Sequence, residues 1–240
     1  MTDTSIHTPA RSMPAYVATP GRPPPWPGVV LVHDAFGMTQ VLRRHADWLA
    51  SEGYLAAAPA LFRGGGGFAC VRAIFREIAA GHGPAFDDVE STRAWLVAQP
   101  GCTGRVGVIG FCMGGGFALA LAARHGFAAA APNYGRLPKH AEAVLEGACP
   151  VVASYGGKDM ALKGAAAALE RILDAKGVPH DVKEYPGAGH SFLDDFAPGD
   201  APRLVMVLMK LLGQGYHEPS AVDARRRIAA FFDTHLKTVG

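Results

Sequence analysis

A cysteine in a glycine-rich turn has the clearest chemical potential in this sequence. Cys112 follows an apolar run, Val106–Phe111, and precedes an alanine- and leucine-rich stretch, so it stands between a predicted strand and a predicted helix. Gly110 and Gly114 flank it in the small-x-nucleophile-x-small pattern of a strand-to-helix elbow. Such a turn strains the backbone of the nucleophile, and the N–H groups at the start of the helix favour a thiolate over a thiol. The segment therefore predicts a nucleophilic cysteine.

The alternative is a buried structural cysteine in a turn that grips a nucleotide phosphate. The GxGxxG pattern of dinucleotide-binding turns is not present, because Gly107 and Gly110 lie inside the predicted strand and Gly114–Gly116 lie at the start of the helix. The end of the following strand also offers no acidic residue for a ribose. The elbow is therefore the favoured interpretation.

Two further residues fit the chain order nucleophile, acid, histidine. Asp159 follows the predicted strand Val151–Tyr155 and two glycines, and His190 lies in a glycine-rich loop after the predicted strand Asp181–Tyr185. A thiol needs a base, and the base needs a carboxylate that orients it. Taken singly, the aspartate could be a capping or solvated residue and the histidine an ordinary loop residue. Together, in this order and at strand ends, they predict a triad with Cys112.

These residues need a scaffold whose strands end at one edge. Strands and helices are predicted to alternate, which indicates βαβ units and an α/β fold with a mainly parallel, doubly wound sheet flanked by helices. In such a sheet the active site lies beyond the carboxyl ends of the strands. The predicted strands are Val29–His33, Tyr54–Ala58, Val106–Phe111, Ala128–Pro132, Val151–Tyr155 and Asp181–Tyr185, and the predicted helices are Thr39–Ser51, Val71–Ala80, Asp87–Gln99 (capped by Asp87), Gly114–His125, Gly164–Lys176, Arg203–Leu212 and Ala221–Leu236.

The chain is predicted to form one domain preceded by an arm. Residues 1–28 are polar and proline-rich, which suits an extended N-terminal arm with a short edge strand at Tyr16–Ala18. Residues 29–240 are interpreted as a single α/β domain. The glycine run Gly64–Gly67 predicts a flexible loop, which would permit residues 62–86 to close over the site as a lid.

Composition argues against several classes of protein. The 240 residues are 49% hydrophobic and 18% charged with a formal net charge of +2, which suits a globular domain and gives no basic stripe for nucleic acid. No run approaches the roughly 18–20 apolar residues of a membrane span, and no secretory signal pattern opens the chain. Sparse cysteines without metal-binding spacing favour a reducing cytoplasm, with no metal and no disulfide framework. The cysteines are Cys70, Cys102, Cys112 and Cys149.

Four motifs make the sequence resemble the dienelactone hydrolase family of α/β-hydrolases, from about Tyr16 to Leu236. The motifs are VHDAFG at 32–37, GFCMGG at 110–115, GKD at 157–159 and GHSF at 189–192. The resemblance implies an α/β-hydrolase fold with Cys112 as nucleophile, His190 as base and Asp159 as its orienter. It also implies an oxyanion hole made by the backbone N–H groups of Ala35 and Met113, which suits a tetrahedral intermediate that needs two donors.

The resemblance is weaker on the substrate side. Family members carry a carboxylate, most often glutamate, that interacts with the resting thiol; here Asp34 holds the position and either modulates Cys112 or caps the following helix. The archetypal members bind an anionic dienelactone through arginines, one of them four residues after the catalytic histidine. This chain has Asp194 at that position, followed by Asp195, which would repel a carboxylate. Substrate contacts must then come from elsewhere. The candidates are Phe36, Tyr134, Arg136 and Phe192, with Arg72 and Arg76 as further arginines that could equally be solvated surface residues.

The expected chemistry is acyl transfer from an ester or lactone through a thioester at Cys112, without a metal or organic cofactor. The expected partner is a small-molecule substrate, and the protein is expected to be a monomer or a small homo-oligomer. Three alternatives remain open: a general carboxylesterase without lactone preference, a non-catalytic small-molecule sensor, and a redox-sensing thiol. The intact triad argues against the sensor, and the lack of a resolving cysteine near Cys112 in the sequence argues against the redox role.

Overall fold

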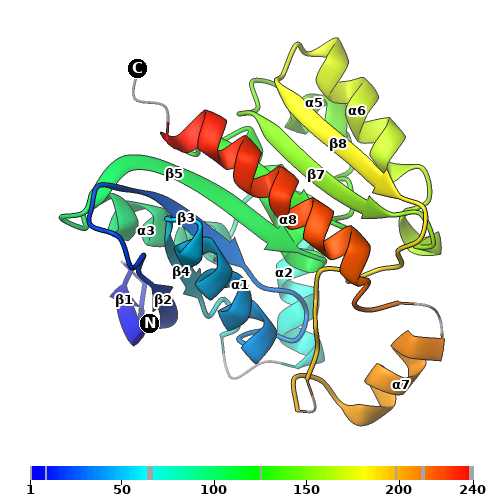
Figure 1. Cartoon of the computed structure of the whole chain (residues 1–240), viewed down its shortest axis with the longest axis horizontal. Coiled ribbons are helices and arrows are strands. Elements are labelled where there is room, and N and C mark those ends of the chain that lie inside the picture. Colours follow the sequence, from blue (N-terminus) through cyan, green and yellow to red (C-terminus); the bar gives the residue numbers. More distant parts are fainter. Residues whose placement is uncertain are drawn as a thin grey trace.

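A mixed β-sheet organises the protein. The computed structural model describes residues 2–8, 10–63, 67–124, 126–197, 199–211 and 214–237. Within these ranges eight strands pair in the order β1-β2-β4-β3-β5-β6-β7-β8 (Figure 1). Their bounds are β1 Thr2–His7, β2 Ser12–Ala18, β3 Trp26–Val32, β4 Leu55–Pro59, β5 Cys102–Phe111, β6 Ala129–Asn133, β7 Val151–Gly156 and β8 His180–Tyr185.

The sheet is parallel from β4 through β3 and β5 to β8, as the sequence predicted. Residues 29–32 of β3 are fully buried on both faces, which is typical of a parallel strand covered by helices on each side. The N-terminal segment is extended, but it is not an arm apart from the domain. β1 and β2 form an antiparallel hairpin, and β2 adds to the sheet by pairing antiparallel with β4.

Helices cover both faces of this sheet. The buried residues of α1 and α8 pack on one face, and those of α2, α3, α4 and α6 pack on the other. Figure 1 shows α8 lying across the first of these faces. The bounds are α1 Gln40–Ser51, α2 Phe68–Ala80, α3 Pro84–Val97, α4 Met113–Ala122, α5 Ala141–Val144, α6 Ala165–Ala175, α7 Arg203–Leu211 and α8 Glu218–Phe232, with a 3₁₀ turn η1 at Met160–Leu162 and a π-helical turn η2 at Asp233–Lys237.

Some predicted helix ends differ from the observed ones. Thr39 caps α1, its side-chain oxygen accepting a hydrogen bond from the Leu42 N–H at 3.3 Å. The prediction that Asp87 caps α3 is wrong: Gly83 is the cap, and the helix begins at Pro84, whose fixed φ suits a first helical position. Of the predicted glycine loop, residues 64–66 lie outside the described residues, as do the predicted helix ends at positions 125 and 212.

The order of the strands creates one crevice. β3 lies between β4 and β5, so the connections that follow β3 and β5 leave the sheet in opposite directions. At such a switch point the loops after the two strands separate, and a crevice opens beyond their carboxyl ends. The VHDAFG and GFCMGG motifs end β3 and β5, and the topology therefore places both at the crevice.

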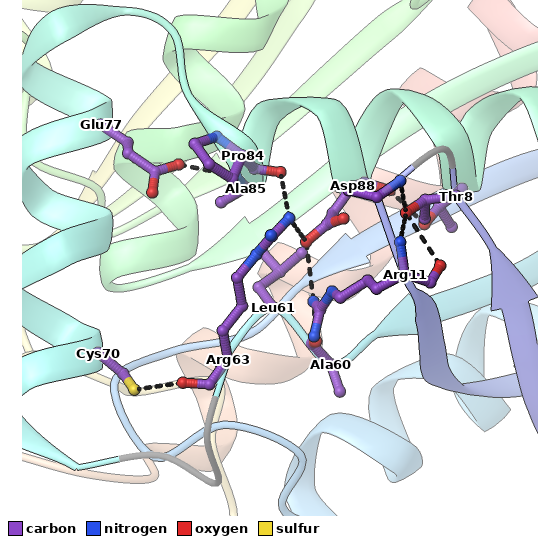
Figure 2. Close-up of polar contacts among 12 residues, drawn as sticks. Thr8, Arg11, Ala60, Leu61, Arg63, Cys70, Glu77, Pro84, Ala85 and Asp88 are labelled. Carbon is purple, nitrogen blue, oxygen red and sulfur yellow. Dashed lines mark hydrogen bonds and ion pairs between the residues drawn. The ribbon is translucent and has the colours of Figure 1, made fainter.

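A buried aspartate fastens the helices on the far face to the hairpin. Asp88 of α3 is fully buried and accepts hydrogen bonds from Arg11 at 2.8 Å and Arg63 at 3.0 Å (Figure 2). Glu77 of α2 accepts from the Ala85 N–H at 2.7 Å and so joins α2 to the start of α3. These contacts fix α2, which forms one wall of the cavity described below. No helix in the described ranges is both long and apolar enough to span a membrane.

Candidate active site

The turn at Cys112 has the strained geometry that the glycines predict. β5 ends at Phe111, α4 begins at Met113, and Cys112 between them has φ 54° and ψ −112°. A positive φ is costly for a residue with a side chain and persists where the surrounding structure requires it. A β-carbon on Gly110 would lie 1.9 Å from the Gly114 carbonyl oxygen. Only glycine at position 110 allows the chain to turn this tightly.

Cys112 stands at the start of α4. Its carbonyl oxygen accepts hydrogen bonds from the Gly115 and Gly116 N–H groups, at 3.0 and 3.2 Å, and so begins the helix, while its own N–H donates to the Asn133 carbonyl oxygen at 3.1 Å. The half-buried side chain lines a cavity. The dipole of α4 places a partial positive charge beside the sulfur.

Asp159 and His190 meet as the sequence analysis expected. Asp159 is 1% exposed and follows β7; its Oδ2 accepts a hydrogen bond from Nδ1 of His190 at 2.5 Å, and its Oδ1 accepts from the Ala161 N–H at 3.1 Å. The second contact fixes the plane of the carboxylate. The first orients the imidazole, so that Nε2 is the nitrogen left for the nucleophile.

The charge of His190 is coupled to both of its neighbours. Burial alone would lower the pKa of His190, but hydrogen bonds with Asp159 and Cys112 and the charges of both groups raise it to about 10. The imidazole is therefore protonated at neutral pH. An imidazolium hydrogen-bonded to a thiol group is the arrangement that maintains a reactive thiolate.

Two backbone N–H groups lie at the places expected for an oxyanion hole. Ala35 follows β3, and Met113 is the first residue of α4. In the described part of the chain neither N–H donates to another group. The end of β3 and the start of α4 are in close contact, since a β-carbon on Gly114 would lie 2.2 Å from the Val32 carbonyl oxygen. Both donors thus belong to the same corner of the crevice.

Asp34 does not cap the helix that follows it. In the described part of the chain its carboxylate also makes no contact with the Cys112 sulfur. It is 8% exposed, and its Oδ1 accepts a hydrogen bond from the Phe36 N–H at 2.7 Å, which closes a turn after β3. Burial raises its pKa to about 7, with a further contribution from the charge of Asp194, while the Phe36 and Gly37 N–H groups and His190 act in the opposite direction. Asp34 is therefore coupled to His190 through charge.

A cavity of about 750 Å³ opens over the triad. It is lined by Phe75, Ile78, Ala79, Cys112, Met113, Gly116, Tyr134, Arg136, Leu137, Pro138, Lys139, Ala161, Leu162 and His190. Two of the predicted substrate contacts, Tyr134 and Arg136, are in this lining, and Lys139 adds a second cation that sequence reasoning missed. The position of Lys139 in the loop after β6, at the carboxyl edge of the sheet, could have identified it from the sequence.

The other predicted substrate contacts lie elsewhere. Phe36 packs edge-on against Phe196, with ring centroids 5.7 Å apart. Phe192 is fully buried and packs against Tyr134. Neither is in the cavity lining, and the same holds for Arg72 and Arg76, which are exposed on α2. Within the described residues, no group of three or more histidine, cysteine, aspartate or glutamate side chains is arranged to hold a metal ion.

Asp194 is not a cavity residue either. It is 2% exposed, and its two carboxylate oxygens contact His45 Nε2 at 2.9 Å and the Tyr134 hydroxyl at 2.7 Å. The sequence analysis expected this aspartate to repel an anionic substrate. In the structure its carboxylate is enclosed by two partners behind the cavity wall. His45 was not identified from the sequence as part of the site, because it lies in α1, far away along the chain.

The loop that carries His190 is tied to a later part of the chain. The His190 carbonyl oxygen accepts a hydrogen bond from the Gly215 N–H at 2.8 Å, and the Phe192 carbonyl oxygen accepts from the His217 N–H at 3.1 Å. α7 lies between these anchor points, and Figure 1 shows it apart from the sheet. Its exposed apolar side chains are Leu204, Val207, Leu208 and Leu211.

Known proteins share this architecture. The family model described as "Dienelactone hydrolase family" matches residues 13–236. The chain is 32% identical over 190 residues to a carboxymethylenebutenolidase of Pseudomonas putida, covering 74% of this chain and 79% of that protein. It is 29% identical over 227 residues to a carboxymethylenebutenolidase of Rhodococcus opacus, covering 88% and 82%. A solved structure, a dienelactone hydrolase-like promiscuous phosphotriesterase from metagenomic libraries, superposes with a TM-score of 0.81 at 21% identity and 98% coverage of each chain. That likeness shows the shared α/β-hydrolase fold.

Proposed function

The chain belongs to the dienelactone hydrolase family, and we propose that it is a hydrolase of the carboxymethylenebutenolidase type that cleaves a carboxylic ester or lactone through a thioester on Cys112. The observation that carries this proposal is the Cys112–His190–Asp159 arrangement at the wall of a 750 Å³ cavity. The curated relatives named carboxymethylenebutenolidase support the reaction class.

The proposed reaction has two halves. In the first, the Cys112 thiolate attacks the carbonyl carbon, and the Ala35 and Met113 N–H groups stabilise the oxyanion. The C–O bond then breaks, the leaving alkoxide takes the proton of the His190 imidazolium, and a thioester remains. In the second half, neutral His190 accepts a proton from water, hydroxide adds to the thioester, and the C–S bond breaks. The product leaves as the carboxylic acid, which releases its proton to the solvent, and the thiolate–imidazolium pair is restored.

The cavity lining supports an acidic substrate. Most of the wall is apolar, and besides the His190 imidazolium the cations that line it are Arg136 and Lys139, both in the loop after β6. A carboxylate on the substrate would gain a charge-assisted hydrogen bond from either group. We therefore propose an ester or lactone that carries a carboxylate. We expect Arg136→Met to raise KM for an acidic ester by about tenfold, the effect of roughly 1.4 kcal/mol, and to leave KM for a neutral ester almost unchanged.

A matched control separates this effect from a general change of charge. Arg76→Met removes a cation of the same type from α2, where the side chain is exposed and does not line the cavity. We expect this variant to keep both KM values. Equal losses for acidic and neutral esters in Arg136→Met would contradict an anion site and would favour a carboxylesterase without this preference.

Substitution of Cys112 and measurement of the intact protein mass both test whether Cys112 is the nucleophile. We expect Cys112→Ala to abolish turnover of activated esters and lactones and Cys112→Ser to retain only a small residue of activity. Intact-mass measurement after mixing should show the acyl group on the wild-type protein and not on Cys112→Ala. Cys70→Ala is the control, because Cys70 is also a half-buried free thiol but lies outside the cavity lining. Unchanged turnover in Cys112→Ala would disprove the proposal, whereas a wild-type protein with neither turnover nor an acyl-enzyme would favour a sensor or redox role.

The thiol also bears on the compartment in which the protein works. All four cysteines are free. Because free thiols persist where the environment is reducing, we propose a cytoplasmic location. The proposed partner is a small-molecule substrate.

A further inference from the structure

A buried polar cluster lies directly behind the triad. It consists of His45 from α1, Tyr134 after β6 and Asp194 four residues after His190. The three side chains meet at distances of 2.7 and 2.9 Å, and each residue is at most 2% exposed. They come from three separate parts of the chain. The proposed reaction uses only the Tyr134 ring, as part of the cavity wall.

The protonation of Tyr134 and His45 determines which groups donate hydrogen bonds in this cluster. Burial raises the pKa of Tyr134 well above its usual value, with Asp194 adding to the effect, so the hydroxyl keeps its proton and donates it. Burial lowers the pKa of His45, so the imidazole is neutral at neutral pH. Nε2 is then the protonated nitrogen, because it faces Asp194, and Nδ1 has no hydrogen-bond partner in the described part of the chain.

Asp194 therefore accepts two hydrogen bonds, one from each of its partners. The groups around it are neutral dipoles and another carboxylate: His45, Tyr134 and, by charge, Asp34. Burying a carboxylate without a cation in contact is costly, and such arrangements are weak evidence for stability. Arg44 and Arg225 influence His45 only through their charges. A stabilising role alone is therefore a poor explanation of the cluster.

The cluster contacts His190 itself and the residue before Cys112. The His45 ring stacks on Phe111, the residue before Cys112, with centroids 4.1 Å apart and an interplanar angle of 8°. The Tyr134 ring packs edge-on against His190, with centroids 5.2 Å apart. Tyr134 also has φ 40°, a left-handed conformation that is costly for a residue with a side chain. The hydrogen bond to Asp194 holds that strained residue against the base.

We propose that Asp194 is a positioning residue for the thiolate–imidazolium pair: through His45 and Tyr134 it fixes Phe111 and the His190 ring, and its negative charge favours the protonated base. The proposal rests on the proposed nucleophilic role of Cys112. The charged and titratable groups that face His190 are then Asp159, Cys112 and Tyr134, with Asp34 acting by charge. Asp194 adds to this environment from behind the tyrosine.

The test uses the full chain and reads the thiolate without a substrate. Asp194→Asn keeps the shape of the side chain and removes its charge. Cys112 alkylation by iodoacetamide between pH 5 and 9, measured by mass on the peptide that contains Cys112, reports the thiolate. We expect the alkylation rate near pH 6 to fall about tenfold, the effect of a shift of about one pKa unit. Asp88→Asn is the matched control, because Asp88 is an equally buried carboxylate on the other face of the sheet.

Asp88→Asn should lower stability while its folded fraction keeps the wild-type alkylation profile. A wild-type alkylation profile in folded Asp194→Asn would overturn the role of the charge. Tyr134→Phe is the second variant, and it decides the positioning role if Asp194→Asn does not fold. It keeps the ring and loses the hydrogen bond, so we expect kcat for an activated ester to fall about tenfold with little change in the alkylation profile. Unchanged kcat in folded Tyr134→Phe would overturn the positioning role.

The experiment also separates this inference from the proposed function. If the wild-type protein turns over no ester, the proposed reaction fails, and the alkylation profile of Asp194→Asn still decides whether Asp194 controls the thiolate. If ester turnover is normal and neither variant differs from wild type, the cluster has only a packing role.

Discussion

Asp34 makes the stability of the protein depend on pH in a way that one substitution should remove. The carboxyl group is buried after β3, and its pKa is raised from an ordinary value of 3.8 to about 7. The native state thus binds the proton more tightly than the unfolded chain does. Because the unfolded state releases the proton first, the free energy of unfolding falls as the pH rises from about 4 to about 7, and this contribution is constant above that window.

The size of the effect follows from the shift. Each pKa unit corresponds to about 1.4 kcal/mol, so the ionisation of Asp34 costs the native state on the order of 4 kcal/mol above pH 7. Asp34→Asn has no ionisable group and keeps an oxygen to accept the Phe36 N–H bond. Its amide N–H₂ must find a place in the buried site, which offsets part of the gain. We expect the variant to be about 2–4 kcal/mol more stable than wild type at pH 8, with little or no advantage at pH 4.

Urea unfolding at pH 4, 5.5, 7 and 8, followed by tryptophan fluorescence, gives the stability difference between the two proteins at each pH. Asp195→Asn is the control, because Asp195 neighbours Asp194 in the chain but its side chain is exposed. Its stability difference from wild type should not vary with pH. A flat difference for Asp34→Asn as well, or a variant less stable than wild type at pH 8, would refute the reasoning.

The remaining predictions concern packing and capping. Gly114→Ala should reduce stability by about 1–3 kcal/mol and lower ester turnover, because the new β-carbon would lie 2.2 Å from the Val32 carbonyl oxygen and must displace the start of α4; urea unfolding and an ester assay measure both, and wild-type activity would contradict it. Arg11→Met should cost about 1–3 kcal/mol in urea unfolding, since fully buried Asp88 loses a donor at 2.8 Å; a loss below about 0.5 kcal/mol would count against it. Thr39→Ala removes the cap of α1 and should lower the free energy of unfolding in urea by about 1 kcal/mol. A variant as stable as the wild-type protein would contradict this prediction.

The sequence predicted the parts of this fold that depend on local pattern. Apolar runs such as Val29–His33 and Val151–Tyr155 marked strands that the structure contains within a few residues. The positions after such strands pointed to the Cys112, Asp159 and His190 side chains, because parallel strands bring their carboxyl ends to one edge. The hairpin strand β1 was not predicted, because it is mostly polar and only Ile6 of its residues is fully buried.

The features that sequence reasoning missed depend on contacts between distant parts of the chain. No residue near Asp194 in the sequence indicates that its side chain contacts His45. Sequence reasoning therefore placed the charge of Asp194 beside the substrate and not in a buried cluster. Phe192 stands two residues after His190 in the GHSF motif, but its side chain is buried in the core. Lys139 shares the cavity wall with Arg136 only because the loop after β6 folds over the start of α4, where the Arg136 carbonyl oxygen approaches Gly116.

The anchor points around α7 have a consequence for which substitutions the His190 loop can tolerate. The chain departs beside His190 and returns to the same place, where the Gly215 and His217 N–H groups bond to the His190 and Phe192 carbonyl oxygens. The loop that carries His190 is therefore held at its base by hydrogen bonds that involve no residue of α7. Substitutions at the exposed side chains of α7, such as Leu204 and Leu211, are therefore expected to leave the position of His190 unchanged.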